Sequence, residues 1–585
     1  MYYPSMASLI HKLKKGHLYT YWVESKRVNG KPRIVEQVYL GRRDRVLEEM
    51  KRAYTRGSTP GPTPLRRLQH REFGASAWLW HWADRLGLVR LIDAHVPPVE
   101  AKRRTQLSVG QYLVLAAINR VIDPRSKRAF YEYWYQDSVL ARLCPAKEGE
   151  LTSQRFWDHM NQVQPEHLES IQKDLVARLG ELFPLGEDTI LYDATNYFTF
   201  IDTFNERSEL AQRGWNKQKR TDLRQLSLAL FEDERTGLPL YHQCYAGDRP
   251  DVSQFETAWQ ALVKTWVGGL RRRPEQLTLV FDKGNGSKEN LARLEDGKVR
   301  YVGAIPGHWV PDLLEVGLAD YRKLELPGSR HVKGRRVRRE FWGKLRTLLV
   351  VFSPSFYRKQ RAVMNRHQAK VEGRLVELAQ AIDQWPKTHH GKGYSEESVR
   401  RQIGEWTGRD HLREYFAMDL STDQKGKVIG LTWTWDRGRK RTVQRTYLGK
   451  TVLVTDHDEW EDPQIVLAYR KLWKAERMFR ISKDGPWWPM CHWTDSKVRV
   501  HAFYCYLALL LLAILQRQLQ DAGVTLSVDR CIDRLKALQE TLVLYTNGAS
   551  ERLLSDRDPL QEQLFQALDL GLIAEQLGTT ALPLA

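Results

Sequence analysis

Short apolar runs alternate with polar turns between residues 186 and about 305. The runs at 189–192 and 277–281 have strand length, and each stops at an aspartate, Asp193 or Asp282, before turn-forming residues. The runs at 224–231 and 239–245 predict a hairpin, 251–267 a helix, and 300–304 the last strand of the sheet. This alternation of strands and helices predicts an α/β domain with a mixed sheet.

The rest of the chain divides by the same patterns into further regions. Residues 1–70 read as a β-hairpin at 16–41 followed by a Pro-rich linker, and 71–185 as a helical region whose short helices, rich in Arg and Trp, suit DNA binding. The α/β domain then splits into 186–305 and 456–520 around a basic, β-rich insertion at 306–455, and 521–585 reads as a helical tail. The apolar run 502–515 is too short to span a bilayer and predicts a buried helix beneath the sheet.

Asp193 and Asp282 are the first candidates for chemistry. An unpaired carboxylate at the end of a buried strand is costly to desolvate, so packing alone does not explain it. On neighbouring strands the two acids would lie side by side, where a divalent cation can neutralise both. The alternative is that each aspartate only caps the turn after its strand.

A third acid is predicted on a helix far downstream. Asp462-Pro463 reads as a helix start, and Gly485-Pro486 as the next break. Glu476 falls on the same face of this helix as apolar residues that should meet the core. A metal shared with the two aspartates would satisfy its charge, and an i,i+4 ion pair with Arg480 is the alternative.

Asp, Asp and Glu on strand, strand and helix resemble the DDE transposases of bacterial insertion sequences. The first-aspartate strand, the basic segment 217–225 with its Asp-Leu-x-Gln ending, and the turn at Gly247-Asp248 with Asp251 all resemble that family. Its Tyr-x2-Arg-x3-Glu-x6-Lys signature is matched by Tyr469, Glu476 and Lys483, whereas Leu472 stands at the arginine position. The resemblance implies an RNase H-like catalytic domain interrupted by a β-rich insertion.

Charge favours a polyanionic partner. The 91 Lys and Arg exceed the 71 Asp and Glu, which gives a net charge of +20. Residues 321–370 hold 15 basic residues and two acids, and this stretch is either a DNA surface or a solvated face. The five cysteines show no paired spacing, so neither a zinc site nor a disulfide framework is indicated. The candidate DNA contacts are Arg335, Arg336, Arg338, Arg339, Lys217, Lys219, Arg220, Tyr469, Arg480 and Lys483.

The leading hypothesis is transposition by two-metal phosphoryl transfer on DNA. Asp193 would bridge two Mg²⁺ ions, with Asp282 on one and Glu476 on the other, and Mn²⁺ should substitute. The expected partners are the terminal inverted repeats, target DNA and a second copy of the chain, which would form a dimer on DNA. The N-terminus lacks the apolar core of a signal peptide, so the protein is expected to be cytoplasmic.

Three other functions are alternatives to transposition. A metal-dependent nuclease or resolvase of the same fold would carry the same acids, and a transposase-derived DNA-binding protein would have lost catalysis. Intact acids at 193, 282 and 476 disfavour the latter. A haloacid-dehalogenase-like phosphatase would need an acid two residues after its first aspartate, where this chain has Thr195.

Overall fold

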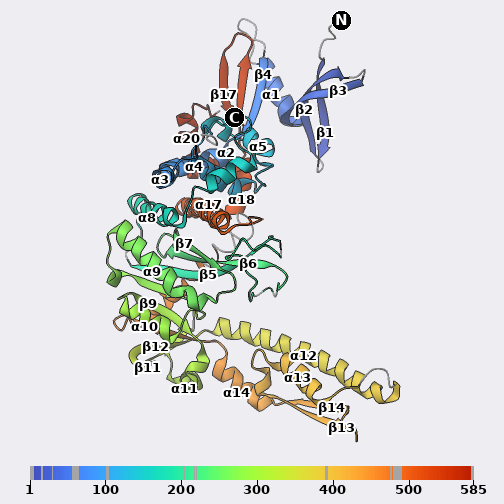
Figure 1. Ribbon diagram of the computed structural model, residues 1–585, viewed down its shortest axis with the longest axis vertical. Helices are drawn as coiled ribbons and strands as arrows, with labels where there is room; N and C mark the ends of the chain where they lie inside the picture. Colours follow the sequence, from blue (N-terminus) through green and yellow to red (C-terminus); the bar gives the residue numbers. More distant parts are fainter. Residues whose placement is uncertain are drawn as a thin grey trace.

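The computed structural model describes residues 6–14, 17–28, 31–55, 65–100, 105–186, 188–202, 204–216, 218, 220–388, 393–474, 477 and 490–581. At its centre is a nine-stranded sheet in the order β10-β11-β12-β15-β9-β8-β5-β6-β7, which confirms the α/β class (Figure 1). The strands are β5 (Thr189–Thr199), β6 (Arg224–Asp233), β7 (Pro239–Ala246), β8 (Thr278–Phe281), β9 (Arg300–Ile305), β10 (Arg322–Lys323), β11 (Lys333–Phe341), β12 (Lys344–Phe352) and β15 (Lys450–Thr455).

The middle of this sheet has the strand pattern of an RNase H-like domain. Strands β5, β8 and β9 are parallel neighbours, and β6 and β7 form the predicted antiparallel hairpin beside β5. The crossovers between the parallel strands contain α9 (Asp251–Leu270) and α10 (Lys288–Asp296). Because parallel strands share a direction, β5, β8 and β9 present their carboxyl ends at one edge of the sheet. We call this the carboxyl edge.

The sheet does not stop at β9, although 300–304 was expected to be its last strand. Strand β15 pairs antiparallel with β9, β12 pairs with β15, and β11 pairs with β12. Much of the basic stretch thus forms strands of the main sheet rather than a separate insertion. The apolar inner positions of β12 and β15, such as Leu349 and Leu453, extend the core beneath the helix that follows β15.

Each face of the sheet is covered by helices. On one face α15 (Asp462–Arg470) buries Ile465, Val466 and Ala468 against apolar side chains of the central strands, including Leu191 and Val280. On the other face α9 and α10 pack Phe255, Leu262 and Leu291 into the main core. The sheet is therefore the middle layer of three.

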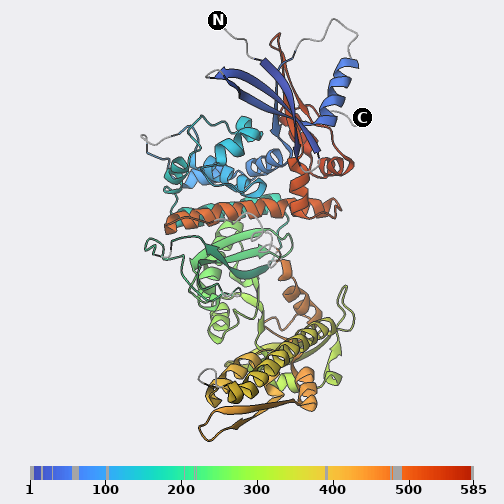
Figure 2. The ribbon, with the colours of Figure 1, turned by 90° about the vertical axis from the view of Figure 1, so that its right-hand side faces the viewer.

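A long buried helix separates the sheet from the N-terminal half (Figure 2). This is α17 (Asp495–Asp521), which packs between β7 and α4 (Val109–Ile122). Its length and apolar composition would suffice to cross a membrane, but 94% of its most apolar window is buried inside the protein. The predicted buried helix is confirmed. Helix α4 begins with a capping box of Ser108 and Gln111.

The first and the last described segments of the chain lie toward one end of the molecule (Figures 1 and 2). The expected N-terminal hairpin is a three-stranded sheet, β1 (Met6–Lys14), β2 (His17–Val28) and β3 (Lys31–Arg42), followed by α1 (Arg43–Thr55). The tail is not purely helical: between α18 (Val528–Lys536) and α19 (Pro559–Ala567) it contains β16 (Gln539–Tyr545) and β17 (Ser550–Leu554). Strand β16 pairs with β4 (Leu65–Glu72), so the tail completes a sheet begun before residue 73.

The remaining helices of the N-terminal half form a bundle with one shared core. Two of them are short, α5 (Phe130–Tyr133) and α7 (Ser153–Met160). The other helices of the bundle are α2 (Gly74–Arg85), α3 (Leu88–His95), α6 (Leu140–Leu143) and α8 (Pro165–Leu182). The C-terminal α20 (Leu570–Gln576) packs against α2.

A protruding subdomain lies at the end opposite the termini (Figure 1). It contains α12 (Pro354–Thr388), α13 (Glu396–Thr407), β13 (Phe416–Thr422), β14 (Val428–Trp435) and α14 (Arg437–Tyr447). Its apolar side chains form a core of their own, centred on residues such as Leu375, Ile403 and Tyr415. The subdomain leaves the sheet after β12 and returns to it at β15.

Candidate active site

Asp193 and Asp282 occupy adjacent positions on neighbouring parallel strands. Tyr192 pairs with Phe281 across β5 and β8, so each aspartate directly follows a paired residue. Leu191 and Val280, two positions earlier, both belong to the core under α15, and alternation along a strand therefore points the aspartates to that same face. By this register the two aspartates occupy neighbouring positions at the carboxyl edge, and their role as metal ligands stays a prediction.

Strand β5 does not end at Asp193, as its sequence predicted. It continues to Thr199 because β6 still pairs with it there, from Asp193 opposite Leu230 to Thr199 opposite Arg224. Its other neighbour, β8, ends at Phe281. Asp193 therefore lies where β5 loses its partner on one side only. Its Oδ1 accepts a hydrogen bond from the amide of Ala194 at 2.8 Å.

Tyr469 connects α15 to Asp282. Its hydroxyl donates a hydrogen bond to Oδ1 of Asp282 at 2.9 Å. Tyr469 is also one of the predicted DNA contacts. In the structure its hydroxyl binds the Asp282 carboxylate, and a contact with DNA stays a prediction. Tyr469 is the penultimate residue of α15, so the end of this helix lies close to Asp282.

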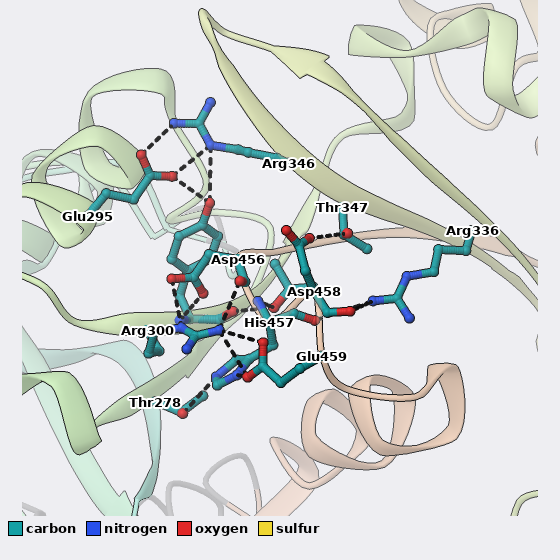
Figure 3. Close-up of polar contacts among 12 residues, drawn as sticks. Thr278, Glu295, Arg300, Arg336, Arg346, Thr347, Asp456, His457, Asp458 and Glu459 are labelled. Atoms are coloured by element: carbon teal, nitrogen blue, oxygen red, sulfur yellow. Dashed lines mark hydrogen bonds and ion pairs between the residues drawn. The ribbon is translucent and has the colours of Figure 1, made fainter.

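A polar network fixes the loop from which α15 starts (Figure 3). Arg300 binds Asp456 at 3.1 Å and Glu459 at 2.9 Å, and His457 bridges Thr278 and Glu459 at 2.9 and 2.7 Å. Although burial opposes ionisation, hydrogen bonds from His457 and Arg300 lower the pKa of Glu459 to about 2. The network holds this loop at the amino ends of the parallel strands, and α15 then runs back toward their carboxyl ends.

The described part of α15 is shorter than the predicted helix. It begins with a capping box of Glu461 and Gln464, one residue before the expected cap, and its regular part ends at Arg470. Glu476, Arg480 and Lys483 lie outside the described residues. Leu472, which stands at the signature's arginine position, is 9% exposed and packs in the core under α15.

Two lysines after α15 tie this region to the sheet. Lys471 pairs with Glu234 at 2.5 Å, and Lys474 donates to the Glu234 carbonyl at 2.6 Å. Nearby Glu232 is 1% exposed, and burial raises its pKa to about 8, against the attraction of Lys474. Because Glu232 is then mostly neutral at pH 7, it adds little negative charge beside Asp193.

The family-like segment before β6 folds against the turn after β7. The buried side-chain amide of Gln225 donates to the carbonyls of Gly247 and Trp215 at 2.8 and 3.1 Å. A Cβ on Gly247 would lie 2.0 Å from the Gln225 carbonyl oxygen, so this close approach requires glycine. The two motifs singled out separately in the sequence thus form one contact at the carboxyl edge.

Trp215, whose carbonyl takes part in this contact, is exposed to solvent. It was not among the residues predicted to bind DNA. Its indole is 81% exposed, although its carbonyl is held by Gln225. Arg220 in the same segment is also exposed and forms a bidentate pair with Asp222 at 2.8 and 2.7 Å. Lys217 and Lys219 lie outside the described residues. The sequence did not indicate which of the tryptophans is exposed, because exposure of a side chain depends on the fold.

The four predicted DNA-contacting arginines of 335–339 lie on β11, and three of them have acidic partners within the chain. Arg336 pairs with Asp462 at 3.4 Å, Arg338 with Asp458 at 2.6 Å, and Arg339 with Asp312 at 2.6 Å. Arg336 also donates to the Trp460 carbonyl at 2.7 Å, which braces the start of α15. The fourth, Arg335, is partly buried. Their contact with phosphates stays a prediction.

The donor set suits a hard divalent cation. Two carboxylates on one face offer oxygen ligands, and Tyr469 orients one of them. Among the described residues no group of three or more His, Cys, Asp and Glu side chains forms a metal-binding cluster. The two aspartates can therefore supply part of an oxygen-ligand site.

Comparison with known proteins places this arrangement among DNA-processing enzymes. A family described as "Transposase DDE domain" matches residues 187–512, from just before β5 to within α17. A solved piggyBac transposase synaptic complex with hairpin DNA is similar over 80% of this chain and 79% of its own, at 10% identity and a TM-score of 0.32. No curated protein matches the chain.

Proposed function

Because the chain belongs to the transposase DDE domain family, we propose that it cleaves DNA and transfers the cut strands to a new site during the movement of an insertion sequence. The observation that carries the proposal is the pairing of Tyr192 with Phe281, which sets Asp193 and Asp282 side by side within the matched region.

We assign the metal site to Asp193, Asp282 and Glu476, with Mg²⁺ as the natural ion and Mn²⁺ as a substitute. Two bound cations would activate the attacking water or 3′-hydroxyl and stabilise the leaving oxygen. The chain's own contribution is to hold the carboxylates: β5 and β8 fix the spacing of two of them, and Tyr469 restrains the Asp282 side chain. No covalent protein intermediate is needed.

The carboxyl edge also carries features suited to DNA. Trp215 offers an exposed ring beside the basic segment 217–220, and such rings stack on bases that have left the duplex. We assign it that role, with Arg220, Lys217 and Lys219 beside the phosphates. Strand cleavage and strand joining are the same chemistry with different nucleophiles, so one site serves both.

The test is strand cleavage and joining on a duplex carrying the inverted repeats that flank the gene. Asp193→Asn, Asp282→Asn and Glu476→Gln should each lower cleavage at least about a thousandfold while DNA binding persists. Asp521→Asn, an exposed aspartate at the end of α17, is the matched control and should leave cleavage unchanged. Cleavage without joining would favour a nuclease, and wild-type activity in the three variants would overturn the proposal.

A further inference from the structure

Helix α14 carries three arginines on one side. Its sequence contains five basic residues and no acid, and Asp436 caps its first turn by accepting hydrogen bonds from the amides of Gly438 and Arg439. Arg437, Arg441 and Arg445 are exposed and four residues apart, so they form a stripe along one side of the helix. Within the described part of the chain, none of these three arginines forms an ion pair.

The stripe is held on a rigid support, because the adjacent side of α14 packs on α12. Lys440 donates to the side chains of Asn365 and Gln368 at 2.9 and 2.7 Å, and Val443 is buried in the subdomain core. Tyr447 stacks on His411 with ring centroids 4.4 Å apart. The guanidinium groups are therefore presented by a fixed helix.

The sheet register places α14 at the carboxyl edge. After α14 the chain turns at Gly449 and enters β15, where Val452 pairs with Ile305 at the end of β9. Gly303 of β9 pairs with Phe281, the residue before Asp282. Helix α14 also contacts α11 (Pro311–Glu315), which follows β9. The C-terminal end of α14 thus lies at the same edge of the sheet as the two aspartates.

The arginines of the stripe differ from those of β11 in having no acidic partner among the described residues. Arg336, Arg338 and Arg339 have acidic side chains within 4 Å, and a phosphate would have to compete with these partners. The stripe carries three charges without such competitors. Over eight residues it spans about 12 Å, comparable to the axial rise of three or four nucleotides of one DNA strand.

We infer that Arg437, Arg441 and Arg445 bind the backbone phosphates of the DNA duplex next to the strand held at the carboxylates. The inference rests on the proposed function, because it assumes that DNA lies at the carboxyl edge. Within the basic region 306–455 it assigns the DNA-binding surface to α14 of the protruding subdomain rather than to β11 of the main sheet. Arginine suits this role because its planar group binds phosphate in a bidentate manner.

The test compares two triple variants by fluorescence anisotropy on the labelled inverted-repeat duplex over a series of salt concentrations. Arg437→Gln/Arg441→Gln/Arg445→Gln should weaken binding at least tenfold near 100 mM salt. It should also reduce the slope of log affinity against log salt by about 2 to 3, since each phosphate contact contributes about 0.9. The control, Arg374→Gln/Arg400→Gln/Arg401→Gln, removes three exposed charges from the same subdomain and should change affinity less than twofold.

The outcomes separate this inference from the proposed function. If the wild-type protein cleaves the duplex and the α14 triple variant binds it with unchanged affinity, the inference is wrong and the proposed function stands. The same holds if the α14 variant and the control variant lose affinity equally. Failure of the wild-type protein to bind or cleave the duplex would overturn both. Thermal unfolding of each variant shows whether it is folded, and the three single Arg→Gln variants replace the triple one if it is not. The Arg→Lys triple should recover part of the affinity.

Discussion

At the residue scale, the site depends on how Asp193 and Asp282 are held. The sequence predicted that Asp193 and Asp282 follow neighbouring strands, and the register of β5 and β8 agrees with this, whereas the catalytic role of both acids stays a prediction. It did not predict that β5 would continue past Asp193, since that depends on pairing with β6. The contact between Tyr469 and Asp282 joins residues 187 positions apart, and no local pattern encodes it.

Replacing Tyr469 with Phe should weaken the site without unfolding it. The change removes one hydrogen bond of about 1 kcal/mol, so we expect the cleavage rate at limiting Mg²⁺ to fall on the order of fivefold. Because the lost contact orients a metal ligand, higher Mg²⁺ should recover part of the rate. Cleavage measured over a Mg²⁺ titration gives the result, with Tyr447→Phe in α14 as the control. An unchanged Mg²⁺ requirement would show that the hydroxyl does not tune the site.

At the scale of elements, sequence patterns predicted some features of α15 but not others. Its start and buried face follow from Pro463 and the apolar spacing, and both agree with the structure. The network around Arg300 that anchors its first turn depends on side chains from several strands and could not be foreseen. The extension of the sheet by β11 and β12 was also missed, because a basic stretch was interpreted as a surface, whereas β12 is buried in the sheet.

Restoring the family's arginine at position 472 should destabilise this chain. Leu472 packs in the core under α15, and an arginine there would bury a charge with no partner in place of an apolar side chain. We expect Leu472→Arg to lower the free energy of unfolding by roughly 3 kcal/mol, and Leu472→Met by less than about 1.5 kcal/mol. Urea unfolding followed by circular dichroism measures both. Equal stability of the two variants would mean that position 472 is open to solvent.

At the scale of the whole molecule, a single active site can act on only one DNA end at a time. Moving an element requires two ends at one target, so two chains should act together, as a dimer with twofold symmetry. The net charge of +20 opposes the approach of two free chains, and bound DNA would neutralise it. The pairing of β4 with β16 could not be predicted from the sequence, since these strands are separated by most of the chain.

Light scattering should therefore find a monomer in the free protein and a complex of two chains on inverted-repeat DNA. The fraction of protein in the two-chain complex should fall as the salt concentration rises, because charge neutralisation by DNA contributes to its formation. The protein alone at the same salt concentrations is the control. A complex that stays at one chain and one DNA end while cleavage proceeds would favour a nuclease over a transposase.

The most direct test of the central claim is a metal switch at the scissile phosphate. The leaving oxygen of the inverted-repeat duplex is replaced by sulfur, and cleavage is measured in Mg²⁺ and in Mn²⁺. If the carboxylates bind a cation that contacts the leaving atom, the sulfur substrate should be cleaved poorly in Mg²⁺. Mn²⁺ should restore its cleavage, because Mn²⁺ accepts sulfur as a ligand more readily. Asp193→Asn and Asp282→Asn should show no restoration. Equal cleavage of the sulfur substrate in both metals, or cleavage in EDTA, would contradict the account.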